Sequence, residues 1–236
     1  MNIQMRGKTA EVLLYEDIGG WFGITADSFI KEIKQLKDVS TINLRINSNG
    51  GNVFDGVTIY NYLKSHQARV EIDIDGLAAS IASIIAMAGD EVRMAENAWM
   101  MIHDPWIVTG GTAEDLRKQA DTMDGIRETL LDTYMVRSSV SREDMSAMMA
   151  EETWLNSTEA ANVGLADTLT KEMAVAAHVH KEWFKNAPDA LDAERVIAVP
   201  ESKISEPDAP KPITAEQKDA REKIARMNQY MRANRL

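Results

Sequence analysis

The chain has 236 residues, enough for one sizeable hydrophobic core or for one domain with an extension. Its 44% hydrophobic and 27% charged residues are ordinary for a soluble globular protein, and the absence of cysteine excludes disulfides, a cysteine nucleophile and thiolate metal sites. The net charge is −11, yet residues 200–236 carry eight basic and six acidic side chains, so residues 1–199 carry −13. Such an acidic body argues against nucleic-acid binding by the core, because phosphate contacts need a basic face.

The sequence predicts neither a signal peptide nor a membrane span. Its first residues, MNIQMR, lack the apolar run of a signal peptide, and no stretch reaches the length of a membrane helix. We therefore expect a cytoplasmic protein without a membrane partner. The lack of cysteine fits a reducing compartment of this kind.

The first hundred residues alternate between strand and helix patterns. Thr25 is placed to cap a first helix, and the patterns at 53–64 and 80–88 predict two more. Strands rich in aliphatic and β-branched residues are predicted at 9–15, 41–46, 70–74, 91–94 and 99–103. Repeated β-α-β units of this kind predict an α/β fold with a largely parallel sheet and helices packed on it.

A long helix is predicted after Gly110 and Gly111. Thr112 is placed to cap it, the next ~25 residues contain no proline, and apolar residues from Leu116 to Tyr134 keep a three-four spacing. A narrow apolar stripe suits either packing against another protein or packing on the helix's own core, and the pattern does not choose between them. Two shorter helices are predicted to follow, capped by Ser141 and by Asn156.

The α/β pattern is lost beyond residue 170. We predict a C-terminal extension at 171–199, a proline-rich flexible linker at 200–213, and a polar, basic tail at 214–236 that is helical if it is ordered. The chain contains no internal repeats.

Ser80 occupies the most informative position in the chain. It follows the strand at 70–74, which is expected to end at Gly76, and it begins an apolar helix. A hydroxyl there lies at the positive end of the helix dipole, near unpaired backbone N–H groups, which suits a nucleophile whose attack creates an oxyanion. Serine is also a favoured helix N-cap, and because caps far outnumber nucleophiles, this segment alone favours the cap.

A base and two oxyanion donors are available nearby. His103 ends a later strand and can take the proton of a serine nucleophile, although a lone histidine is more often structural. The backbone N–H of Ile81 follows the serine, and that of Gly51 lies in a turn where a glycine can face a substrate. Such chemistry requires no metal or organic cofactor, and His178 with His180 supplies too few ligands for a metal site.

Four segments, in this order, resemble the Clp peptidase family, the self-compartmentalising serine peptidases. They are INSNGG at 46–51, GLAAS at 76–80, MIHDP at 101–105 and WLNSTEA at 154–160. The resemblance covers roughly residues 9–170, so we take 1–170 as a peptidase domain. It implies stacked β-β-α units, a nucleophile at Ser80, a base at His103, and a projecting "handle" helix at 112–137 that joins two rings.

The sequence departs from the family pattern at two positions near these motifs. Glu152 stands where the family has the aspartate that orients the base, and its extra methylene shifts the carboxylate. Glu151 and Asp104 remain alternative third members of the triad. Asn49 replaces the proline that usually precedes the paired glycines, which leaves the predicted oxyanion turn workable but less rigid.

The resemblance also implies partners. Members of the family enclose their sites in rings, so we expect a homo-oligomer of heptameric rings, stacked or single, that cleaves protein or peptide substrates with or without an unfolding ATPase. The short N-terminus and the basic C-terminal extension resemble phage and prophage head-maturation proteases, which implies the cytoplasm of a bacterium or of a phage-infected host. On that interpretation residues 200–236 bind a capsid or scaffold protein; a disordered tail without a partner is the alternative.

Three other interpretations remain. A crotonase-type acyl-CoA enzyme shares the architecture but has no need for Ser80 and His103 in these motifs. Peptidases similar to signal-peptide peptidases use a serine–lysine dyad, but no lysine lies between Lys64 and Lys118. A structural ring or scaffold protein with a decayed site is favoured only by Glu152, and covalent labelling of Ser80 separates it from an active peptidase.

Overall fold

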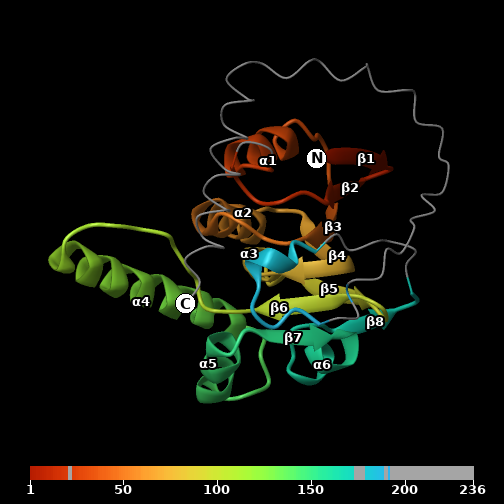
Figure 1. Ribbon diagram of the computed structural model, residues 1–236. Helices are drawn as coiled ribbons and strands as arrows, with labels where there is room; N and C mark the ends of the chain where they lie inside the picture. Colours follow the sequence, from red (N-terminus) through yellow and green to blue (C-terminus); the bar gives the residue numbers. More distant parts are fainter. Residues whose placement is uncertain (21–22, 173–178, 189–190, 192–236) are drawn as a thin grey trace. The chain divides into compact units, whose positions relative to one another are not determined.

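The computed structural model describes residues 1–20, 23–172, 179–188 and 191. The predicted linker at 200–213 and tail at 214–236 therefore lie outside the described residues, and the domain boundaries at 170, 199 and 213 stay predictions. The described elements are arranged around one sheet (Figure 1).

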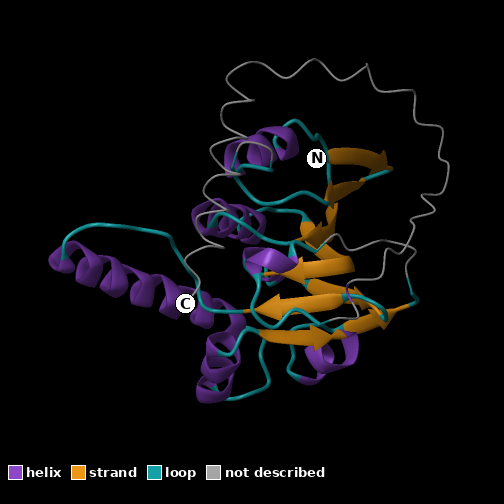
Figure 2. Ribbon diagram, in the orientation of Figure 1, coloured by secondary structure: helices purple, strands orange, loops and turns teal. Residues whose placement is uncertain are grey.

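The sheet has eight strands in the described part of the chain, in the order β1-β2-β3-β4-β5-β8, with β6 paired to β4 and β7 paired to β6 (Figure 2). Pairing is parallel except between β1 and β2 and between β6 and β7. The predicted α/β class is therefore confirmed. The strands are β1 (Asn2–Arg6), β2 (Thr9–Leu14), β3 (Thr41–Ser48), β4 (Arg69–Ala79), β5 (Glu91–Ala95), β6 (Trp99–Ile102), β7 (Thr153–Asn156) and β8 (Thr168–Thr170).

Side-chain caps define the starts of most helices. Thr25, Asn52, Ser141 and Asn156 each accept a hydrogen bond from the backbone N–H three residues ahead, as N-caps do. The predicted caps at Thr25, Ser141 and Asn156 are thus confirmed. The helices are α1 (Ala26–Ile33), α2 (Val53–Lys64), α3 (Ile81–Ala86), α4 (Ala113–Met135), α5 (Arg142–Ala150), α6 (Ser157–Asn162) and a 3-10 turn, η1 (Lys181–Trp183).

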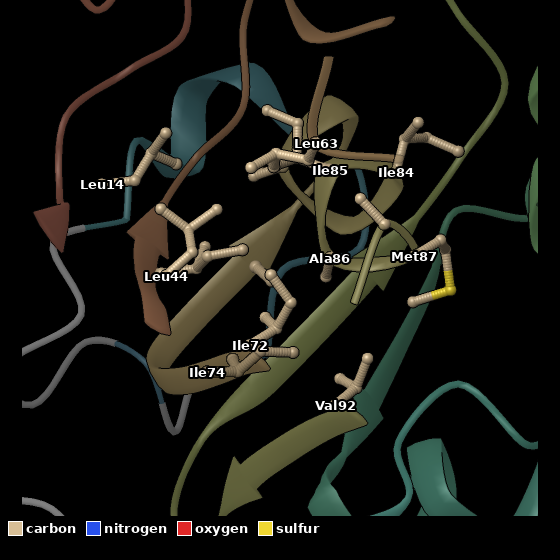
Figure 3. Packing of buried hydrophobic residues seen from close by; sticks show 14 of the residues in the cluster. Leu14, Leu44, Leu63, Ile72, Ile74, Ile84, Ile85, Ala86, Met87 and Val92 are labelled. Atoms are coloured by element: carbon tan, nitrogen blue, oxygen red, sulfur yellow. The ribbon is translucent and has the colours of Figure 1, made fainter. Parts of the chain in front are cut away.

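The hydrophobic core lies between the sheet and helices α1, α2 and α3. Alternate residues of β2 and β3 are buried, as expected for strands with one face on the core. Figure 3 shows Leu44 and Ile72 of the strands packed with Leu63 of α2 and Ile85 of α3. This core fixes the position of α3, and with it the turn that precedes α3.

Strand β4 runs past the glycine at which it was expected to end. Its first half pairs with β5, and its second half, from Leu77 to Ala79, pairs with β6. A glycine inside a strand often marks a bend or a close approach, and the apolar run after Gly76 is buried on both faces like a central parallel strand. The predicted end at Gly76 is therefore wrong, and β4 delivers Ser80 beside β6.

Helix α4 packs on the core of its own domain only near its end. Thr112 and Asp115 form a capping box at its start, and residues 113–122 are exposed where the helix extends away from the sheet (Figure 1). Its end packs on the core through Leu130, Leu131 and Tyr134. None of the described helices has the length and apolar content needed to cross a membrane.

Candidate active site

Ser80 forms a sharp turn between β4 and α3. Its φ of 54° and ψ of −128° lie in a region that side-chain-bearing residues rarely adopt, and its side chain makes no capping hydrogen bond to the described helix. Its backbone N–H donates to the carbonyl of Met101 in β6 at 2.9 Å. The interpretation of Ser80 as a hydroxyl cap is therefore wrong, because the turn directs the hydroxyl away from the helix.

The Ser80 hydroxyl meets the imidazole of His103. Ser80 Oγ lies 2.7 Å from His103 Nε2, a normal hydrogen-bond distance. Strands β4 and β6 run parallel with Ala79 opposite Met101, so the residues that follow the two strands emerge at the same edge of the sheet. Sheet pairing thus brings together two residues that are 23 positions apart in the chain.

Burial sets the protonation of His103. Its side chain is only 10% exposed, and this burial lowers the pKa of the imidazole below its ordinary 6.5 despite the carboxylates of Glu152 and Asp104, which raise it. Lys185 lowers the pKa further. The imidazole is therefore neutral at neutral pH, the state that a general base requires.

Gly50 packs closely against the turn at Ser80. A Cβ on Gly50, whose φ is +92°, would lie 2.6 Å from the carbonyl oxygen of Ala79 and 2.8 Å from Ser80 Cβ. The hydroxyl of Ser48 accepts the N–H of Gly50 at 3.1 Å and holds the loop in place. No role was predicted for Gly50, although the paired glycines at 50 and 51 were the available signal.

Gly51 and Ile81 present backbone N–H groups at this loop. Gly51 lies opposite Ile18 in a bridge whose two hydrogen bonds use the carbonyl of Gly50 and the N–H of Asn52, so the bridge leaves the N–H of Gly51 unused. Ile81 is the first residue of α3, where a helical N–H has no carbonyl one turn earlier to bond. Both N–H groups therefore remain the candidates for oxyanion donors that the sequence predicts.

The three candidate acids differ in what they face. Glu152 Oε2 lies 3.9 Å from His103 Nδ1, the ring nitrogen remote from Ser80. Asp104 is instead bound by Arg127, whose Nε donates to it at 2.7 Å. Glu151 is exposed at the end of α5. The structure therefore brings Glu152 to the imidazole, at a distance longer than a hydrogen bond.

The carboxylate of Glu152 is held by residues of the segment predicted only as a C-terminal extension. Its Oε1 accepts the backbone N–H groups of Lys185 at 2.6 Å and Asn186 at 2.7 Å. The ring of Phe184 lies edge-on to His103, with 6.2 Å between ring centroids. The aromatic residues of the extension were the only signal in the sequence.

Metal ligands do not gather in the described part of the chain, where no group of three or more histidine or acidic side chains is placed to hold an ion. His178 lies outside the described residues. His180 instead pairs with carboxylates of Asp17 at 3.7 Å and Glu182 at 3.5 Å. At Ser80, a hydroxyl, an imidazole and a carboxylate lie in sequence, an arrangement that suits acyl transfer.

Comparison with known proteins gives consistent matches. The family model described as Clp protease matches residues 11–173. The chain is 34% identical over 128 residues to an ATP-dependent Clp protease proteolytic subunit of Deinococcus radiodurans, over 53% of this chain and 63% of that protein. It is 29% identical over 133 residues to proteolytic subunit 1 of Salinibacter ruber, over 56% of this chain and 57% of that protein. It thus spans less than two thirds of the length of either relative.

Two further matches extend the likeness. Proteolytic subunit 2 of a Synechococcus strain is 28% identical over 162 residues, which cover 65% of this chain and 82% of that protein. Among solved structures, a ClpP1 mutant from Listeria monocytogenes aligns with a TM-score of 0.60 and 25% identity, over 69% of this chain and 91% of that one.

Proposed function

The chain belongs to the Clp protease family, and from that membership and the geometry at Ser80 we propose that it is a serine endopeptidase with the triad Ser80, His103 and Glu152. The observation that carries the proposal is the 2.7 Å contact between Ser80 Oγ and His103 Nε2 at a strained turn. Strain at a side-chain-bearing residue is characteristic of functional sites.

The proposed reaction follows the general course of serine hydrolysis. Ser80 Oγ attacks the scissile carbonyl carbon while His103 Nε2 takes its proton, and the N–H groups of Gly51 and Ile81 stabilise the oxyanion. The C–N bond then breaks as His103 returns the proton to the leaving amine. Water, activated by His103, releases the acyl group, and Glu152 orients the imidazole throughout.

Covalent labelling tests the nucleophile. Intact-mass analysis after fluorophosphonate treatment should show one adduct on the parent chain, and Ser80→Ala should show none. Ser83→Ala, which keeps Ser80, should still take the adduct, although more slowly, because Ser83 bonds to the carbonyl of Ser80. An assembled parent protein that takes no adduct would contradict the proposal and would favour the structural ring or scaffold protein.

We also propose that the protein forms a homo-oligomer, with heptameric rings as the expected form. The exposed first half of α4 supports this proposal, because a helix that leaves its own domain is available to another copy. Sedimentation at micromolar concentration should show a species several times the 26.3 kDa of one chain. A monomer alone would contradict the proposal, and addition of an unfolding ATPase to the peptidase assay would show whether one assists it.

The natural substrate is proposed to be a phage or prophage capsid or scaffold protein. The support is the resemblance to head-maturation proteases together with the net charge of +2 over residues 200–236. The parent should cleave the cognate coat or scaffold protein, whereas Ser80→Ala should not. Removal of residues 200–236 should weaken binding of the coat protein, and unchanged binding would contradict docking through the tail.

A further inference from the structure

The two departures from the family pattern share one contact partner. Asn49, in place of the usual proline, and Glu152, in place of aspartate, both hydrogen-bond to residues 179–188. This segment lies beyond residues 11–173, the part that the family model matches. Figure 1 shows it in cyan, next to the strands that carry the site.

At one end, the segment is tied to the glycine loop. The backbone N–H of His180 donates to Asn49 Oδ1 at 3.0 Å, and Asn49 is buried. A proline at position 49 has no side-chain oxygen and no such bond. The residue that replaces the proline thus supplies an acceptor that the segment uses.

At the other end, the segment surrounds the acid. The N–H groups of Lys185 and Asn186 converge on Glu152 Oε1, which leaves Oε2 directed at His103. Asn186 Nδ2 also donates to the carbonyl of Glu151 at 2.7 Å. A carboxylate that accepts two backbone N–H groups is fixed in orientation by bonds to a charged group, which are stronger than neutral ones.

Between the two ends, Phe184 anchors the segment. It is 6% exposed and forms a small cluster with Leu77, Ala79 and Met101 at the ends of β4 and β6, separate from the main core. Its ring packs edge-on against Trp154, with 5.3 Å between centroids, and also contacts the ring of His103. The same aromatic side chain therefore holds the segment down and covers the imidazole.

We propose that residues 179–188 form a clamp that positions Glu152 and encloses His103, so that the active site is completed by a segment outside the part shared with the family. This inference rests on the proposed function of Ser80, His103 and Glu152. Lys185 and Asn186 are positioning residues, since they act through Glu152. The longer side chain of glutamate is what lets one carboxylate reach both the clamp and the imidazole.

Lys185→Pro tests the clamp, with Lys185→Ala as its matched control. Both remove the lysine charge, but only proline removes the N–H bound to Glu152. Phe184 is extended, with φ −121° and ψ 151°, which a following proline accepts. In the full chain, Lys185→Pro should slow fluorophosphonate labelling of Ser80 about tenfold relative to Lys185→Ala, the order expected when a hydrogen bond to a charged group is lost.

A double variant shows whether the effect passes through Glu152. Once Glu152→Ala has removed the carboxylate, adding Lys185→Pro should slow labelling by less than about twofold. Equal labelling rates of Lys185→Pro and Lys185→Ala would overturn the proposal. A double variant whose labelling rate falls by the product of the two single effects would overturn it as well.

The pH profile of Phe184→Ala tests the enclosure of His103. The groups that face the imidazole are Glu152, Asp104 and Lys185, and burial outweighs the two acids in lowering its pKa. Removing the ring admits water, which raises the pKa of His103 toward its ordinary value. The acid limb of the labelling rate should therefore move to higher pH, a change that general loss of stability does not produce. An acid limb at the same pH as in the parent would overturn the proposal that Phe184 encloses His103.

Amide hydrogen exchange tests the clamp independently of the proposed function. If the parent takes no label, the proposed function fails, but the amides of Lys185 and Asn186 should still exchange slowly. In Glu152→Ala they should exchange at least about ten times faster, because their acceptor is gone. Equal rates in the two proteins would overturn the clamp independently of any activity.

Discussion

The two halves of the site are held in different ways. The nucleophile half, Ser80 and His103, is formed by paired strands and a buried helix, and its hydrogen bond measures 2.7 Å. The acid half, Glu152 with residues 184–186, depends on a turn and a segment beyond the family match, and its carboxylate stands 3.9 Å from the imidazole. The sheet thus fixes Ser80 and His103, whereas Glu152 is held by contacts outside the sheet.

Buried hydroxyls reinforce the nucleophile half. Ser83 Oγ donates to the carbonyl of Ser80 at 2.6 Å and lies 2.7 Å from the hydroxyl of Tyr134, which comes from the buried end of α4. The long helix therefore contributes to the turn of the nucleophile as well as extending from the domain.

Gly50→Ala should break the nucleophile half and have the largest effect. The new Cβ would lie within 2.8 Å of Ser80 Cβ and closer still to the carbonyl oxygen of Ala79, so the loop or the turn must move. Because Gly51 and Ile81, the proposed oxyanion donors, directly follow Gly50 and Ser80 in the chain, labelling of Ser80 should fall at least about 100-fold.

Gly125→Ala is the control for Gly50→Ala. Gly125 lies in α4, where a Cβ meets no described atom within 4 Å, and alanine favours the helix. Its labelling rate should equal that of the parent. Parent-like labelling of Gly50→Ala would show that the glycine loop does not form part of the site.

Glu152→Asp tests how the carboxylate of the acid half is held. Aspartate is the residue that the family resemblance leads one to expect, but its shorter carboxylate cannot reach the N–H groups of Lys185 and Asn186 and still face His103. Labelling should therefore slow about tenfold. Faster labelling than in the parent would show that the extra methylene impairs the site and that the clamp does not position it.

Tyr134→Phe should have the smallest effect. It removes the hydroxyl that meets Ser83, while Ser83 still donates to the carbonyl of Ser80. The free energy of unfolding should fall by about 1 kcal/mol in urea titration, with labelling slowed less than about threefold. Ser83→Ala removes both bonds and should slow labelling more than Tyr134→Phe. Slower labelling of Tyr134→Phe than of Ser83→Ala would show that the Tyr134 hydroxyl of α4, rather than the bond from Ser83 to Ser80, supports the turn.

Local signals in the sequence predicted the helices whose ends are marked by capping residues. The helix at Val53–Lys64 has the predicted bounds, and the caps at Thr25 and Asn156 act as predicted, because capping depends on residues three positions apart. The short strands β1, β7 and β8 were not predicted, since their pairing partners, rather than their own residues, hold them in the sheet.

For the site, the sequence by itself determined that Ser80, His103 and the paired glycines stand in the order and spacing of the Clp family. Only the tertiary structure decided that β4 continues past Gly76, that the Ser80 hydroxyl does not cap its helix, and which of three acids faces the imidazole. It also decided the contact between Asn49 and His180, which lie 131 positions apart. Motifs record short-range spacing, whereas contacts over such separations exist only once packing has brought the segments together.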